Sequence, residues 1–561
     1  MSSVRALLFK FPGIVGRALA RFSPSFSPSL AQVLNLRTLR AVGGLFLSVS
    51  LASCGPAKAQ NEAQKPVPNP VVPALAPAYD PAANPVRSSV LTALAVCRAS
   101  ASGLGAAETL CFDASSKTLF VSNADGSVDR FDLTEPARPL RTGIIKTGLT
   151  VNSVAIHQGL LAVACEGRTS TDAGSVQFYD VAGTTRGSPL TMRSEVQVGP
   201  MPDMVCFTPD GKKVLTANEG EASGSDDPPG SVSIVDVATR QVTTLGLESL
   251  DAVRPPGIRV FPGRQASLDI EPEYIAVSAD GARAVVCFQE ANAWGVIDLA
   301  AASGPGWLGF GSFGLKSWAT AMIDTSDKDG GIVRKPSPEV VGMPMPDTII
   351  SHRIGGADYL FTANEGDARD EFQRAKKLRT SLPESRLADA WHGRLKVSSF
   401  DGDQDGDGRI DVLHSYGARS FSIWKFINPA ARSGLVQVFD SGDDFERITA
   451  ERVPRFFNAD TDGAESDQRS DDKGPEPEAL AVGEIDGRTL AFIGLERTGG
   501  IMVYDVSQPA AARFLDYTND RNHLAPETMK FIPGSTSPDG KPLLVVAHEV
   551  SGTTVIYRVR Y

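Results

Sequence analysis

One short stretch of the chain has the residue types and spacing of a metal-binding loop. Residues 401–417 read DGDQDGDGRIDVLHSYG, in which aspartates alternate with other residues. Calcium takes about six to eight oxygen ligands, and alternate side chains of a tight loop can turn inward to supply them. Gly408 permits the sharp bend that such a loop needs. The expected calcium ligands are the carboxylates of Asp403, Asp405, Asp407 and Asp411 and the main-chain carbonyl of Arg409.

This loop differs from an EF-hand. The last position of an EF-hand loop is a bidentate glutamate, whereas His414 stands there, and no strong helical pattern flanks the loop. The loop is more similar to the calcium loops inserted between strands of integrin-type propellers. The alternative interpretation is a solvated acidic turn that binds no ion.

A second set of acidic residues recurs at two fixed places in a repeated unit. One acid stands near the start of the first strand of the unit, in five copies directly after proline. The other stands where the second strand ends. The first-strand acids are Glu108, Asp203, Glu273, Asp347, Glu478 and Glu527. The second-strand acids are Glu166, Glu219, Glu290, Glu365, Glu496 and Glu549.

Rotation-related repeats would turn these acids into a ring around an axis. Like charges at such a ring repel one another unless they are protonated, paired with Arg or Lys, or bridged by cations. One interpretation is therefore a cation-binding mouth. The other, which we favour, is that each carboxylate accepts main-chain N–H groups from the neighbouring unit and fastens the repeats together. A feature present in every repeat usually serves the repeat.

Two further acidic loops occur once each. Residues 323–331 read IDTSDKDGG, so Asp324, Asp327 and Asp329 either bind a cation or shape a turn. In the second run, 466–478, the acids are interrupted by Arg469 and Lys473, which favours a solvated or salt-bridged loop.

Signals for catalysis are weak. The sequence contains no GxSxG, HExxH or GxxxxGK motif, and its six histidines show no metal-ligand spacing. His548 lies next to Glu549 and could act as a base, although a plain strand residue is the preferred interpretation. We therefore predict no catalytic residue.

The elements that position these acids form a repeat. The stretch MPDMVCFTPDGKKVLTANEG has six variants elsewhere in the chain, and each copy reads strand, turn, strand, polar gap, strand. Turns such as PDGK and IDGR are hairpin signals. Seven such units predict an all-β, seven-bladed β-propeller over 96–561, with insertions at about 300–340, 366–434 and 458–474. We expect the last strand, 553–561, to pair with the strand at 90–97 in the first blade.

The N-terminal residues predict export. Residues 1–53 carry basic residues and no acid, and end in a short apolar run that is too short to span a membrane, as in a signal peptide whose start codon is misassigned. The sequence LASC resembles a lipobox, so Cys54 is the expected lipidation site, and Gly55 favours the outer membrane. The alternative is a cut near Ala59 that yields a soluble periplasmic protein. The Pro- and Ala-rich stretch 54–95 reads as an extended tether.

The charge excludes one class of partner. The net charge is −11, and all of the charge in 1–53 is basic, so the rest of the chain is more acidic still. Such a body does not attract nucleic acid through its overall field. We expect a monomer attached to the membrane through its lipid and directed at an unidentified surface ligand.

Many motifs in one order carry a family resemblance. They include YLFTANEGDARD, YGARSFSIW, DSGDDFERITAE, RSDDKGPEPEALAVGEIDGR and LLVVAHEVSGTTVIYRV. Together they resemble the bacterial choice-of-anchor I family, which is related to the mesenchyme-specific cell-surface glycoprotein of sea urchins. The resemblance covers 96–561 and implies an extracellular propeller held by one of several anchors. Some members carry the label alkaline phosphatase, but the resemblance implies no catalytic residue set.

These observations predict a lipid-anchored cell-surface propeller that binds Ca2+ and acts as a binding or scaffold protein. The alternative is an enzyme, a calcium-dependent phosphoric ester hydrolase of the alkaline phosphatase or phytase kind. A phytase-like propeller would use calcium ions and water together with acids and basic residues.

Overall fold

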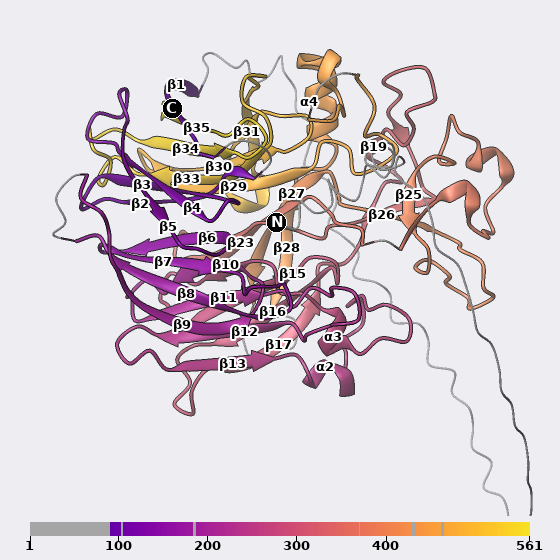
Figure 1. Ribbon diagram of the computed structural model, residues 1–561. Helices are drawn as coiled ribbons and strands as arrows, with labels where there is room; N and C mark the ends of the chain where they lie inside the picture. The colour runs from indigo at the N-terminus through magenta and orange to yellow at the C-terminus, as the bar shows by residue number, and fades with distance from the viewer. Residues whose placement is uncertain (1–89, 102–104, 183–186, 370, 428–433, 462–464) are drawn as a thin grey trace, which may run out of the picture. The chain divides into compact units, whose positions relative to one another are not determined.

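The computed structural model describes residues 90–561, apart from 102–104, 183–186, 370, 428–433 and 462–464 (Figure 1). The expected signal peptide, the lipidation site at Cys54 and almost all of the expected tether lie outside these residues. A search of the described part finds no helix with the length and apolar character needed to cross a membrane.

Most of the described chain forms four-stranded antiparallel sheets, taken here in chain order. The first contains β2 (Ala106–Asp113), β3 (Thr118–Asn123), β4 (Ser127–Asp132) and β5 (Leu140–Lys146). The second contains β6 (Val151–His157), β7 (Leu160–Cys165), β8 (Ala173–Asp180) and β9 (Met192–Pro200). The third contains β10 (Pro202–Phe207), β11 (Lys213–Asn218), β12 (Ser231–Asp236) and β13 (Val242–Gly246). The fourth contains β14 (Ile275–Val277), β15 (Arg283–Phe288), β16 (Ala293–Asp298) and β17 (Gly306–Ser312).

Three more sheets of this kind follow. The fifth contains β22 (Ile349–Ile354), β23 (Ala357–Asn364), β27 (Ser420–Phe426) and β28 (Leu435–Asp440). The sixth contains β29 (Pro477–Ile485), β30 (Arg488–Leu495), β31 (Ile501–Asp505) and β32 (Arg513–Thr518). The seventh contains β33 (Pro526–Ile532), β34 (Leu543–His548), β35 (Thr553–Val559) and β1 (Leu91–Arg98).

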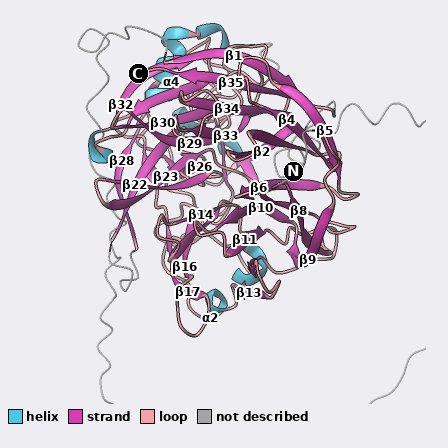
Figure 2. Cartoon of the chain, turned by 90° about the vertical axis from the view of Figure 1, so that its left-hand side faces the viewer, coloured by secondary structure: helices cyan, strands magenta, loops and turns pink. Residues whose placement is uncertain are grey.

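Each sheet runs from a buried interior to a solvated edge. In the first sheet, every residue of β3 and β4 is buried, whereas β5 exposes much of its length. In Figure 2 the first strands β2, β6, β10 and β14 lie nearer the middle, and β1, β5, β9 and β17 lie toward the outside. The buried strands are rich in β-branched and aromatic residues, which fit a pleated surface that is buried on both faces.

The core lies between neighbouring sheets. Phe361 and Phe421 of the fifth sheet share a cluster with Leu480 and Tyr504 of the sixth. The last sheet packs in the same way against the first, since Leu119 shares a cluster with the seventh-sheet strands β34 and β35. Face-to-face packing that closes on itself is the arrangement of a β-propeller, and the all-β propeller prediction is confirmed.

The N-terminal strand completes the last sheet. β1 pairs antiparallel with β35, with Leu91 opposite Val559 and Arg98 opposite Thr553. The pairing follows the prediction, but β1 forms the outer strand of the last sheet rather than part of the first. The sheet also begins inside the segment 54–95 that we expected to be tether.

The first two insertions build one additional sheet. Its order is β18 (Lys316–Ser317), β21 (Val340–Met343), β26 (Leu413–Tyr416), β25 (Lys396–Ser398) and β24 (Phe372–Arg374), and β21 runs parallel to β26. Beside them pair β19 (Met322–Ile323) and β20 (Lys335–Pro336). The structure places β17 and β27 in propeller sheets, although both lie inside the expected insertion ranges.

Helices are few and short in the described residues. They are α2 (Ser249–Ala252), α3 (Ala266–Asp269) and α4 (Asp444–Arg452), with single 3-10 turns at Ala375–Lys377, Glu384–Leu387, Pro454–Phe456 and Pro509–Ala511. Phe445 of α4 packs in the core between the fifth and sixth sheets.

Candidate metal centres

The loop expected to bind calcium connects β25 to β26 in the inserted sheet. Asp403, Asp405 and Asp411 each bring a carboxylate oxygen to within 4.8 Å of the others. Gly406 and Gly408 have φ values of 78° and 79°, so the loop bends through backbone that side chains disfavour. Strands rather than helices flank the loop, in agreement with its departure from an EF-hand.

Hydrogen bonds hold this loop in shape. Asp403 accepts the main-chain N–H groups of Gly406 and Gly408 at 2.8 and 2.9 Å. Asp411 accepts the hydroxyl of Ser381 at 2.6 Å, and this bond lowers the pKa of Asp411. Three of the expected acidic ligands therefore share one place before any ion is considered.

One expected acidic ligand lies outside this group. Asp407 does not join the three converging carboxylates, and its own carboxylate accepts the N–H of Arg409 at 2.8 Å. The Arg409 side chain donates to the carbonyl of Thr380 at 3.2 Å. Ligation by Asp407 and by the Arg409 carbonyl remains a prediction.

The repeated acids occupy equivalent places in the sheets, and main-chain bonds hold each pair together. The N–H of Glu219 donates to the carbonyl of Met201 at 3.0 Å, and the N–H of Glu549 donates to Ala525 at 3.0 Å. Each of these carbonyls belongs to the residue two before the first-strand acid. Met201 and Ala525 have φ values of 49° and 57°, which are strained for residues other than glycine.

The carboxylates of four ring acids are not fully hydrogen-bonded. Most of these acids are buried, and Glu219, Glu478, Glu527 and Glu549 each have one carboxylate oxygen without a hydrogen-bond partner. Across the described residues, no main-chain N–H donates to the carboxylates of these four. The fastening therefore runs through N–H groups such as those of Glu219 and Glu549, and one oxygen of each of the four carboxylates has no hydrogen-bond partner.

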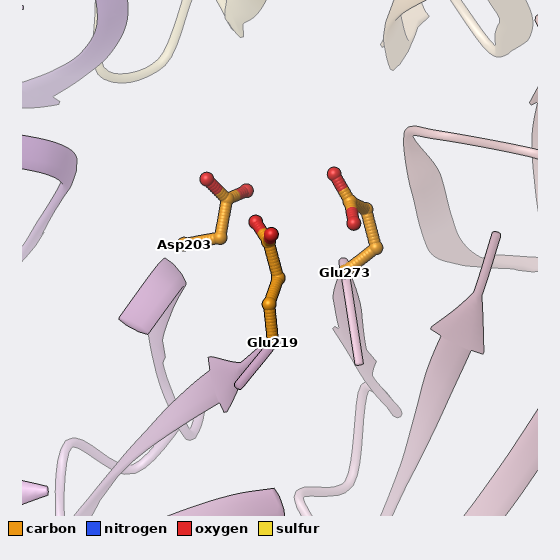
Figure 3. Close-up of side chains that lie close together, drawn as sticks. All are labelled: Asp203, Glu219 and Glu273. Carbon is orange, nitrogen blue, oxygen red and sulfur yellow. The ribbon is translucent and has the colours of Figure 1, made fainter. Parts of the chain in front are cut away.

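One cluster of ring acids joins the third and fourth sheets. Asp203, Glu219 and Glu273 bring carboxylate oxygens to within 4.8 Å of one another. Figure 3 shows the three side chains rising from different segments toward one space. Asp203 is the second residue of β10, Glu219 follows β11, and Glu273 precedes β14.

A second cluster has basic residues built into it. Asp347, Glu365 and Glu478 also bring carboxylate oxygens to within 4.8 Å of one another. Lys473 Nζ lies 2.6 Å from Glu365 and 2.7 Å from Glu476. Lys473 comes from the acidic loop 458–474, which is largely buried and salt-bridged between residues 467 and 474.

Basic partners at other ring acids were also missed by sequence reasoning. Arg497 lies 3.0 Å from the ring acid Glu496, whereas Arg369 forms ion pairs with Asp269 and Glu271, which precede the ring acid Glu273 in the chain. The basic residues stand outside the repeated positions, so the repeat gave no signal for them.

Burial and crowding change how these acids titrate. Burial raises the pKa of Glu478 well above its usual range, and the carboxylates of Glu527 and Glu496 raise it further. Burial, together with Glu496, raises the pKa of Glu549 to about 8. The pKa of Glu365 rises only to about 7, because Lys473 opposes the effect of burial.

Two places of the ring carry amides. The register of β14 and β15 puts Gln289 where Glu219 stands in the third sheet, so the expected acid Glu290 lies one residue beyond. Gln289 donates to Glu365 at 2.9 Å. Asn152 takes the first-strand place in the second sheet and is buried.

The loop 323–331 joins a different acid from the one expected. Asp324 and Asp329 gather with Asp467, with carboxylate oxygens within 4.8 Å, whereas Asp327 forms an ion pair with Arg394 at 2.9 Å. Burial raises the pKa of Asp324 to about 8. Asp467 comes from a distant loop, and no local spacing pointed to it.

His548 does not have the environment of a general base. It is 3% exposed within β34, and burial lowers its pKa to about 3. The described structure thus agrees with its interpretation as a strand residue.

The fold and its acids define a class: an all-β propeller with buried carboxylates shared between its sheets. Comparison with protein families is consistent with this class. The chain belongs to the choice-of-anchor I domain family, whose family model matches residues 108–509. The resemblance seen in the sequence is confirmed.

Relatives match parts of the chain. Gigasin-3a of Magallana gigas is 32% identical over 194 residues, which are 31% of this chain and 66% of that protein. The Mesenchyme-specific cell surface glycoprotein of Strongylocentrotus purpuratus is 26% identical over 233 residues, which are 35% of this chain and 30% of that protein. The chain therefore spans just under two thirds of the first relative and under a third of the second.

Solved structures give weak alignments. A chain of Kuenenia stuttgartiensis hydrazine synthase aligns at 14% identity with a TM-score of 0.45, covering 82% of this chain and 97% of that one. The β-propeller domain of Myceliophteria thermophila Cps50 (Swd1) aligns at 11% identity with a TM-score of 0.43, covering 84% and 100%. Alignments this weak carry no functional conclusion.

The raised pKa values predict an unusual pH dependence for the protein stripped of divalent cations. Glu549 holds its proton in the folded state up to about pH 8 but loses it near pH 4.5 when unfolded. Its stabilising contribution is therefore complete below pH 4.5 and is lost as the pH rises to 8. We expect the melting temperature to fall by about 5 °C between pH 5 and pH 8.

The matched variant Glu549→Gln should show a smaller fall, since it removes one of the titrating groups. A melting temperature that is constant or rises over this range would contradict the account.

Proposed function

We propose that the protein is a cell-surface β-propeller that binds calcium through the loop 403–411 and acts as a binding or scaffold protein. The observation that carries this proposal is the convergence of Asp403, Asp405 and Asp411 on a glycine-bent loop. These residues offer only oxygen donors, which suit a hard cation such as Ca2+.

The position of the loop supports a role in binding. Residues 404–409 are exposed at one end of the inserted sheet, away from the packed core of the propeller. A calcium ion held there would keep coordination positions open to solvent. An acidic group of a partner could then complete the coordination shell.

Family membership supports the location. One relative is named as a cell-surface glycoprotein, and the family name refers to a choice of anchors. For this chain we propose lipidation at Cys54, which would tether the propeller to the outer membrane or cell surface.

The calcium loop predicts the effect of one substitution. Asp405→Ala removes one of three converging carboxylates, so the variant should lose about one equivalent of bound calcium and part of the calcium-induced rise in melting temperature. Metal analysis and thermal unfolding measure both quantities.

The matched control is Asp389→Ala, an exposed aspartate of the same inserted region that forms an ion pair with Lys376. It should behave like the unchanged protein. Equal calcium content in the Asp405→Ala and Asp389→Ala proteins would overturn the loop as a calcium site.

The binding role predicts no phosphoesterase activity. A chromogenic phosphate ester should remain intact in the presence of calcium, manganese or magnesium between pH 5 and pH 10. Turnover that disappears on chelation would instead establish the hydrolase alternative.

The anchor predicts a change in fractionation. The unchanged protein should partition with membranes, and Cys54→Ser should release it to the soluble exported fraction. A Cys54→Ser protein that stays with the membranes would refute lipidation at this residue.

A further inference from the structure

The cluster of Asp203, Glu219 and Glu273 has the donor set of a second metal site. Their carboxylate oxygens lie within 4.8 Å of one another and come from three segments of two adjacent sheets. Figure 3 shows the three carboxylates turned toward a common space. Carboxylates from separate rigid strands form a preorganised set of ligands.

An orphaned oxygen points to a ligand in this space. Glu219 is 2% exposed, and its Oε1 atom has no hydrogen-bond partner in the described structure. A buried carboxylate oxygen without a partner costs free energy unless something else compensates it. Because Glu219 is held by the bond from its N–H to Met201, its side chain cannot leave the cluster easily.

The charge of this cluster differs from that of its counterpart. Within the described chain, no Lys or Arg forms an ion pair with Asp203 or Glu219, whereas Lys473 neutralises Glu365 in the cluster of Asp347, Glu365 and Glu478. The cluster of Asp347, Glu365 and Glu478 thus contains a lysine ion pair, whereas Asp203 and Glu219 form none with the described Lys and Arg residues.

We propose that Asp203, Glu219 and Glu273 bind a divalent hard cation, Ca2+ or one of similar chemistry, between the third and fourth sheets. Asp203 is only partly buried, so an ion can reach the cluster from solvent. Waters complete the coordination shell, since calcium takes about six to eight oxygens. This site is separate from the loop 403–411 and does not depend on it.

Protons are the competing way to balance the same charges. Burial and the neighbouring acids Asp203 and Glu271 raise the pKa of Glu219, and burial with Glu219 and Asp203 raises the pKa of Glu273. Protons therefore compete with a cation for these carboxylates. A bound cation and a bound proton predict opposite effects of a neutral isosteric side chain on the melting temperature in calcium.

The test uses the full chain and Ca2+ alone as the probe. Calcium content and the calcium-induced shift in melting temperature are measured for the unchanged protein, Glu219→Gln and Asp405→Ala. Glu219→Gln should lose about one equivalent of calcium and melt lower than the unchanged protein in calcium. Asp405→Ala should retain the equivalent bound at the buried site and still respond to calcium.

The matched control is Glu527→Gln. Glu527 occupies the place of Glu273 in the seventh sheet and also has an unpartnered oxygen, but it belongs to none of the acid clusters with metal-like geometry. It should bind as much calcium as the unchanged protein.

Several results would overturn the proposal. The first is a Glu219→Gln protein with unchanged calcium content. The second is a Glu219→Gln protein that melts higher than the unchanged protein in calcium, which means that the acid was protonated. If Glu219→Gln does not fold, the Asp405→Ala protein provides the test. Complete loss of its calcium-induced shift in melting temperature would exclude the buried site. If Asp405→Ala keeps all of its calcium and Glu219→Gln loses some, only the proposed calcium site in the loop 403–411 is refuted.

Discussion

The electrostatics of buried carboxylates constrain this molecule more than any other interaction. A propeller repeats its sheets around a common middle, so an acid at one place of the repeat becomes a set of acids facing one another. Glu478 and Glu527 are two members. Burial raises the pKa of both, Glu527 raises the pKa of Glu478 further, and Glu549 raises the pKa of Glu527 further. At low dielectric such charges cannot all be ionised without compensation. The fold is stable only where protons, basic side chains or cations balance them.

The chain uses its non-repeated segments to supply part of that balance. The loop 458–474 leaves the propeller sheets, and Lys473 returns from it to Glu365 and Glu476. Arg419, which lies between β26 and β27, is 2% exposed and forms an ion pair with Glu446 of α4. The inserted sheet and its neighbouring loop therefore contribute to the electrostatic balance as well as carrying the loop expected to bind calcium. The third and fourth sheets receive less of this compensation at Asp203 and Glu219.

The sequence predicted the repeated part of the fold well because its signals are local. Apolar runs separated by Asp-Gly turns define hairpins, and seven such units correspond to the four-stranded sheets. The inserted sheet could not be predicted in this way. Its centre is the parallel pair of β21 with β26, which joins Val340 to Leu413 without any local pattern. The same limit explains why the cluster of Asp324 and Asp467 was missed.

The candidate sites show the same division. The convergence of acids in the loop expected to bind calcium could be anticipated because the spacing is contained in one stretch, and Asp403, Asp405 and Asp411 do converge. The ring was predicted as a set, but the expectation that main-chain N–H groups hold the carboxylates was not supported for Glu219, Glu478, Glu527 and Glu549. Hydrogen-bond partners depend on how two sheets meet, and one repeat read alone does not contain that geometry.

The central claim is that a divalent cation balances the acids between the third and fourth sheets. An anomalous difference map from crystals grown with calcium or manganese tests it most directly. The account predicts a peak at about 2.0 to 2.6 Å from carboxylate oxygens of Asp203, Glu219 and Glu273. A map with a strong peak at the loop 403–411, no peak at this cluster and its carboxylates hydrogen-bonded to one another would contradict it.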